Sequence, residues 1–148
     1  MADHEVLRAP HVLEFPYVRS TGPVIGAFFT ALRDGRLVGI RSPGTGVVVP
    51  PTEYDPVTGE DTGEMVDVGP AGTVTTWAWA SSPRPDQPLE RPFAWALIQL
   101  DGADTALLHA VDTGGDADAV HSGMRVTARF RPDRQGTWRD LECFVPES

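Results

Sequence analysis

Residues 41–59 read RSPGTGVVVPPTEYDPVTG. Glycine and proline recur along this stretch, and both residue types are typical of tight turns. A short apolar run from Val47 to Val49 lies between two turn-forming parts. It is stopped by Pro50 and Pro51, because proline cannot donate a hydrogen bond to a continuing sheet. We therefore expect a hairpin, a proline corner and a second turn.

A zinc ribbon has a similar outline, with a Cys-x-x-Cys pair in each turn, because Zn²⁺ is held by four tetrahedral thiolate or imidazole donors. Neutral hydroxyls do not replace thiolates at neutral pH. The chain contains a single cysteine, Cys143. Residues 36–66 are therefore expected to form a degenerate ribbon without metal. Two alternatives stay open: an ordinary proline-rich loop, and a metal held by Asp55 and a distant histidine. The four degenerate ligand positions are Ser42, Thr45, Asp55 and Thr58.

The second half of the chain has the pattern of a β-barrel. Its strand-like segments are rich in β-branched and aromatic residues or alternate between apolar and polar positions. A short helical turn is expected at residues 116–120. Five strands with a small helical turn before the fourth are typical of an OB-type Greek-key barrel. The predicted strands are residues 72–81, 93–100, 105–111, 124–131 and 140–145.

One helix is predicted before the ribbon. Ser20 or Thr21 can cap it, Pro23 suits its first turn, and Asp34-Gly35 ends it. The fold is thus expected to be mainly β, with three parts. These are an N-terminal arm and helix at residues 1–35, the degenerate ribbon at 36–66 and the OB barrel at 67–148.

The predicted helix has a wide apolar face. Such a face usually packs within its own domain, but an OB barrel fills its own interior and leaves the helix without an obvious partner. A large exposed apolar patch marks an interface. We therefore expect this face to contact another chain. Its residues are Val24, Ile25, Phe28, Phe29 and Leu32.

The composition limits the classes of function. The net charge is −9, every basic residue is arginine, and no basic stripe is visible, so nucleic acid is not the expected partner. No apolar run approaches the length of a membrane span, and the first residues do not resemble a secretion signal. We expect a cytoplasmic protein that does not bind membranes.

Six short motifs, taken in order, resemble one known family over residues 20–148. It is the acyl-CoA-associated zinc-ribbon plus OB-fold family, long called a domain of unknown function. The resemblance implies a non-catalytic partner of thiolase-superfamily or lipid-transfer-protein-like subunits, including aldolases of steroid side-chain breakdown. It implies a hetero-oligomer with no cofactor of its own, although a CoA thioester could be bound jointly with the partner. The motifs are LRDG at 32–35, LVGIR at 37–41, VPP at 49–51, GTV at 72–74, FAWALIQL at 93–100 and SGMRV at 122–126.

The tryptophans offer three interpretations. Trp77 and Trp79 share one face of their predicted strand, and Trp95 lies on the next strand. They could pack in the core, stack bases on the sheet as other OB folds do, or line an acyl-chain or CoA path shared with a partner. No catalytic residue is predicted, because no histidine has a nucleophile or orienting group at a recognisable spacing.

Three functional hypotheses follow. The first is an accessory subunit that completes a thiolase-fold acyl-CoA enzyme. The second is a stand-alone OB-fold binder of nucleic acid or a small ligand. The third is an enzyme in its own right, a thioesterase or hydratase acting on CoA esters. The first is preferred because it joins the family resemblance to an apolar helix without a partner.

Overall fold

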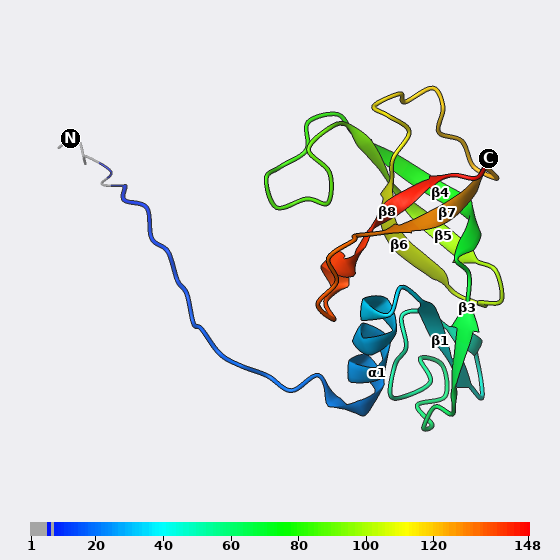
Figure 1. Ribbon diagram of the computed structural model, residues 1–148. Coiled ribbons are helices and arrows are strands. Elements are labelled where there is room, and N and C mark those ends of the chain that lie inside the picture. Colours follow the sequence, from blue (N-terminus) through cyan, green and yellow to red (C-terminus); the bar gives the residue numbers. More distant parts are fainter. Residues whose placement is uncertain (1–5, 7) are drawn as a thin grey trace.

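The computed structural model describes residue 6 and residues 8–148 of the chain. Residues 8–21 have no helix or strand and extend away from the folded body (Figure 1). One α-helix, eight strands and a short 3₁₀ helix follow in the described part. They are α1 (Gly22–Arg33), β1 (Leu37–Ser42), β2 (Gly46–Val48), β3 (Met65–Val68), β4 (Ala71–Ala80), β5 (Phe93–Leu100), β6 (Ala106–Val111), β7 (Arg125–Phe130), η1 (Trp138–Asp140) and β8 (Leu141–Pro146).

Helix α1 begins and ends close to the predicted residues. Thr21 is its N-cap and a proline lies in its first turn. At the other end the chain turns at Gly35, whose φ is 73°, a left-handed conformation that glycine adopts without strain. The Gly35 N–H donates to the Leu32 carbonyl at 3.0 Å and the Arg36 N–H to the Ala31 carbonyl at 2.9 Å, which closes the helix.

The ribbon region is a three-stranded antiparallel sheet in the order β2-β1-β3. The β1–β2 hairpin was expected from the sequence. The third strand, β3, was not predicted, and the expected boundary between residues 66 and 67 falls inside it. Strand β3 pairs with β1 from Leu37 opposite Val68 to Ile40 opposite Met65.

The second half is a closed five-stranded barrel with the strand order β4-β5-β6-β8-β7. All neighbouring strands are antiparallel except β6 and β8, which are parallel. This arrangement confirms the prediction of a mainly β chain with an N-terminal helix and an OB-type barrel. One detail was wrong. Residues 116–120 form turns instead of a helix, and the short helix of the barrel is η1, which precedes the last strand.

A single cluster of buried side chains runs from α1 through the ribbon sheet into the barrel. Phe28 and Leu32 of α1 belong to it, with exposed fractions of 1% and 0%. Figure 1 shows α1 beside the ribbon strands, with both below the barrel. Hydrogen bonds from backbone N–H groups of the ribbon region also join it to the barrel. Val47 donates to the Asp104 carboxylate at 2.7 Å and Val49 donates to the Thr105 hydroxyl at 2.8 Å.

The prediction that the whole apolar face of α1 contacts a partner is therefore wrong for two of its residues. Phe28 and Leu32 are enclosed by the chain itself, because the ribbon sheet and η1 cover the helix. The Phe28 ring packs against Trp138 of η1 with the ring centres 5.4 Å apart. Only Val24, Ile25 and Phe29 keep part of their surface exposed.

No helix in residue 6 or residues 8–148 combines the length and apolar composition needed to cross a membrane.

Candidate functional site

The ribbon is organised around the carboxylate of Asp55, which lies where a metal-binding ribbon would carry one of its ligands. Asp55 is 2% exposed. Its Oδ2 accepts a short hydrogen bond from the Ser42 hydroxyl and another from the Gly44 N–H at 2.8 Å. Its Oδ1 accepts from the N–H groups of Val57 at 2.7 Å and Thr58 at 2.8 Å. One carboxylate thus joins the two turns, and we call residues 42–46 and 54–59 the knuckle.

These hydrogen bonds explain the ionisation of Asp55. The Ser42 hydroxyl, followed by the N–H groups of Thr58, Val57 and Gly44, stabilises the charged form and lowers the pKa of this carboxyl well below its usual range, against the opposing effect of burial. Gly44 is required at its position because a Cβ there would lie 2.7 Å from the Thr58 methyl group and 3.0 Å from Asp55 Oδ1.

The knuckle does not fit a zinc ion. Its centre presents one carboxylate, one hydroxyl and several N–H donors, and N–H groups repel a cation. The Thr45 hydroxyl is buried and has no hydrogen-bond partner in the described residues. Thr58 contacts Asp55 through its backbone N–H and not through its side chain. The described residues contain no group of three or more His, Cys, Asp and Glu side chains that could hold a metal. These donors argue against the alternative of a metal held by Asp55 and a distant histidine.

The three tryptophans do not line one path. In the β4–β5 pair, Trp77 lies opposite Ala96 and Trp79 opposite Ala94, while Trp95 lies opposite Ala78. Neighbouring positions along a strand point to opposite faces, so Trp95 faces away from the other two. Trp77 and Trp79 pack against the main core, and Trp95 packs against a smaller cluster outside the barrel. The prediction of one channel lined by all three is wrong.

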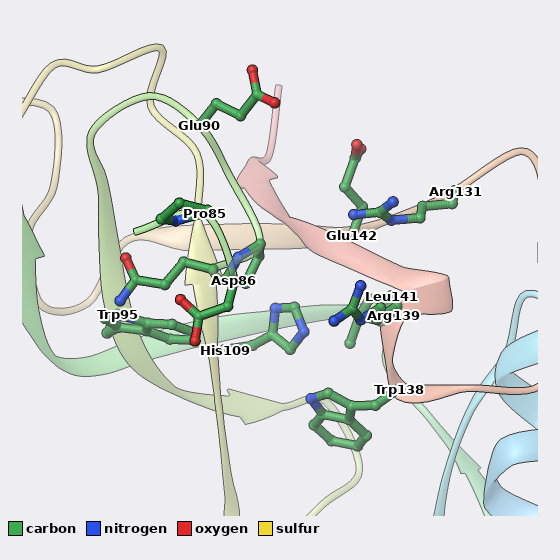
Figure 2. Close-up of a pocket in the computed structure, with 12 residues that line it drawn as sticks. Pro85, Asp86, Glu90, Trp95, His109, Arg131, Trp138, Arg139, Leu141 and Glu142 are labelled. Carbon is green, nitrogen blue, oxygen red and sulfur yellow. The ribbon is translucent and has the colours of Figure 1, made fainter. Parts of the chain in front are cut away.

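Trp95 instead borders a cavity of about 390 Å³. Strands β6 and β8 pair only at Val111 opposite Phe144, and before that point the start of β8 and η1 border the opening. His109 from β6, Trp138 and Arg139 from η1 and the proline-rich loop at residues 85–88 complete much of the lining. Figure 2 shows these side chains converging from separate elements.

The buried His109 ring and Cys143 thiol are both uncharged at neutral pH. Burial lowers the pKa of His109 to about 4, so its ring is neutral. Burial raises the pKa of the Cys143 thiol to about 12, so the thiolate that would act as a nucleophile is absent. His109 has no carboxylate hydrogen-bonded to it in the described residues. In the described residues, His109 and Cys143 therefore do not form an activated nucleophile and base pair.

One buried ionic cluster was missed from the sequence. Asp112 is 4% exposed. Arg91 and Arg129 bind its carboxylate, and the Gly114 N–H donates to it at 2.9 Å. The hydrogen bond from Arg91 is the main cause that lowers the pKa of Asp112 to about 2. Both arginines are distant in sequence, at 91 and 129, so no local pattern indicates the cluster.

The fold and the knuckle together define a class of protein: a helix, a three-stranded ribbon sheet and an OB barrel that share one core. Comparisons with known proteins agree with this class. Residues 65–131 match the family model described as ChsH2, C-terminal OB-fold domain. The barrel of this chain is thus similar to that domain.

Solved structures extend the similarity beyond the barrel. A chain of the "Ltp2-ChsH2(DUF35) aldolase" is 25% identical, with a TM-score of 0.57, over 81% of this chain and 91% of that chain. A DUF35 family protein of unknown function from Sulfolobus solfataricus has a TM-score of 0.61 over 86% and 87% of the two chains. At 19% identity it supports the fold alone. A comparison with curated proteins finds no match. These findings confirm the resemblance to the zinc-ribbon plus OB-fold, or DUF35, family.

Proposed function

We propose that this chain is a non-catalytic accessory subunit of a thiolase-superfamily enzyme that acts on acyl-CoA thioesters. The observation that carries the proposal is the similarity to a chain of the Ltp2-ChsH2(DUF35) aldolase, which extends over 91% of that chain. The resemblance seen in the sequence implies the same kind of partner. In its most specific form, the enzyme is an aldolase of steroid side-chain breakdown.

The division of labour follows from the side chains available. The partner supplies the nucleophile and the acid and base groups, because in the described residues of this chain the only cysteine is a buried thiol and the buried histidine is neutral. This chain stabilises the partner and closes one side of its substrate channel. Excluding water there strengthens the electrostatic interactions of the catalytic groups. A CoA thioester is then bound jointly, without a metal.

We place the partner contact on the N-terminal arm and the start of α1. In the arm, Phe15 is 73% exposed and Tyr17 is 80% exposed, and Leu13, Phe15 and Tyr17 follow one another at a spacing of two residues. An extended segment with this alternation can add to the edge of a sheet or lie in an apolar groove of another protein. The arm leads directly into α1, where Val24, Ile25 and Phe29 are half-buried and extend the same surface.

Co-expression tests the proposal. A tagged version of the full chain is expressed together with a thiolase-fold subunit encoded beside its gene, and the eluate of an affinity column is analysed by mass spectrometry. We expect the two proteins to elute in a fixed ratio. Elution of this chain alone would contradict the proposal, and binding of single-stranded DNA at physiological salt would favour the stand-alone OB-fold binder instead.

A further inference from the structure

The cavity beside Trp95 contains features that the accessory function does not explain. Trp95 and Trp138 each contribute part of its wall. Both indoles are supported from behind: Trp95 packs edge-on against Phe93 with ring centres 5.1 Å apart, and Trp138 packs against Phe28 at 5.4 Å. Rings held in this way keep their orientation, and their exposed faces favour a flat aromatic ligand.

Two arginines at the same cavity are not paired. In the described part of the chain, Arg131 and Arg139 form no ion pair, although the net charge is −9 and acidic residues outnumber basic ones by 21 to 12. Among the other described arginines, those at 33, 36, 41, 91, 125 and 129 pair with carboxylates, while those at 8, 19, 84 and 134 do not. A planar guanidinium is well suited to bind a carboxylate through two parallel hydrogen bonds. The cavity therefore offers free cationic donors next to its aromatic wall.

Two buried polar atoms of the cavity residues have no partner. Arg131 Nε and His109 Nδ1 are enclosed and make no hydrogen bond in the described residues. His109 is 2% exposed, and its ring lies between those of Trp138 and Phe144, 5.9 Å from each. Buried polar groups are normally satisfied, and an unsatisfied one requires an explanation. A bound polar molecule is one explanation that can be tested.

The charge around the cavity selects among anions. Asp86, Glu90 and Glu142 also line it, and Glu142 is paired with Arg129. Three carboxylates repel a doubly charged phosphate more strongly than a singly charged carboxylate. The volume of about 390 Å³ is large enough for a one- or two-ring molecule. The chemistry therefore favours a monoanion on a flat ring.

We propose that this cavity binds a small planar aromatic carboxylate, with its ring against Trp95 and Trp138 and its carboxylate on Arg131 and Arg139. The site is formed by this chain alone. It is independent of the proposed partner, so either idea can fail without the other.

Isothermal titration calorimetry on the full chain tests the site with 2-naphthoate, its neutral analogue 2-naphthamide and inorganic phosphate. We expect naphthoate to bind at least about tenfold more tightly than either of the other two. Arg131→Gln and Arg139→Gln should each weaken naphthoate binding by about tenfold, a loss of about 1.4 kcal/mol. Arg131→Lys, which keeps the charge without the planar donors, should also weaken it. Arg41→Gln, on the distant ribbon, is the matched control and should bind normally.

Circular dichroism of each variant establishes that it is folded. The proposal is overturned if folded wild-type protein does not bind naphthoate, if the amide or phosphate binds equally well, or if folded Arg131→Gln and Arg139→Gln both keep the wild-type affinity.

Discussion

At the scale of single residues, the knuckle is joined by hydrogen bonds to one carboxylate. A metal-binding ribbon places a cation at its centre and thiolates around it, whereas this chain places an anion there and surrounds it with donors. Asp55 accepts from the Ser42 hydroxyl and from three backbone N–H groups, including those of Gly44 and Thr58. These hydrogen bonds keep the two turns together, and we expect folding not to depend on a metal.

Replacing Asp55 tests this description. Asp55→Ala leaves a buried hydroxyl and three N–H groups without an acceptor, so we expect the midpoint of thermal unfolding to fall by about 10 °C. Asp55→Asn, which keeps one carbonyl oxygen as an acceptor, should lower the unfolding midpoint by less. Asp61→Ala, at an exposed position of the same loop, is the control. Addition of EDTA should leave the wild-type midpoint unchanged, and a clear fall on chelation would show that a metal stabilises the knuckle.

His109 gives the stability of the chain a particular dependence on pH. Its pKa is about 4 in the folded chain against 6.5 for the free side chain. Between these values the unfolded state binds more protons, so the free energy of unfolding decreases as pH falls from 6.5 to about 4 and is unaffected above that window. Across this window the free energy of unfolding decreases by about 3 kcal/mol. Chemical denaturation across this range should show it in the wild type.

His109→Phe should lack this part of the pH dependence, while His121→Phe, at an exposed position, should keep it. The buried carboxylates do not obscure the window. Hydrogen bonds lower the pKa of Asp112 to about 2, so the stability that Asp112 contributes is lost only at more acidic pH. Equal slopes for wild type and His109→Phe between pH 6.5 and 4 would contradict the burial of a neutral ring.

At the scale of secondary-structure elements, the sequence predicts where an element begins and ends better than which other elements pack against it. The ends of α1 follow from Pro23 and Gly35, because turn chemistry is local, whereas the Thr21 side chain makes no capping hydrogen bond. The sequence does not predict which elements cover α1. The local sequence patterns of β3 and η1 are weak, and these elements come close to α1 or to the ribbon sheet only in the folded chain. The interface prediction failed at Phe28 and Leu32 for this reason.

The arm and α1 give the clearest test of the proposed partner surface. Phe15→Asp and Tyr17→Asp place charges on side chains that are exposed and far from the core, so the unfolding midpoint should change by less than about 2 °C. Co-purification with the thiolase-fold subunit should fall at least about tenfold, because a charge in an apolar contact is unfavourable. Val57→Asp, at a knuckle position that is 77% exposed, is the matched control. Unchanged co-purification of both arm variants would place the interface elsewhere.

At the scale of the whole molecule, the barrel could be predicted and the candidate site could not. Strand alternation fixes five barrel strands, since every second residue must face the core. The cavity depends on residues from β5, β6, η1 and two loops that only the closed barrel brings together. The shared core explains why the helix, ribbon and barrel belong to one structure, although the sequence suggested three parts.

The central claim is that this chain acts as part of an assembly with a thiolase-fold enzyme subunit. The most direct measurement is the mass of the co-expressed pair by size-exclusion chromatography with light scattering. The account predicts one species that contains both chains and does not dissociate on dilution to about 1 μM. Two separate species at every concentration, with this chain stable and monodisperse alone, would contradict it.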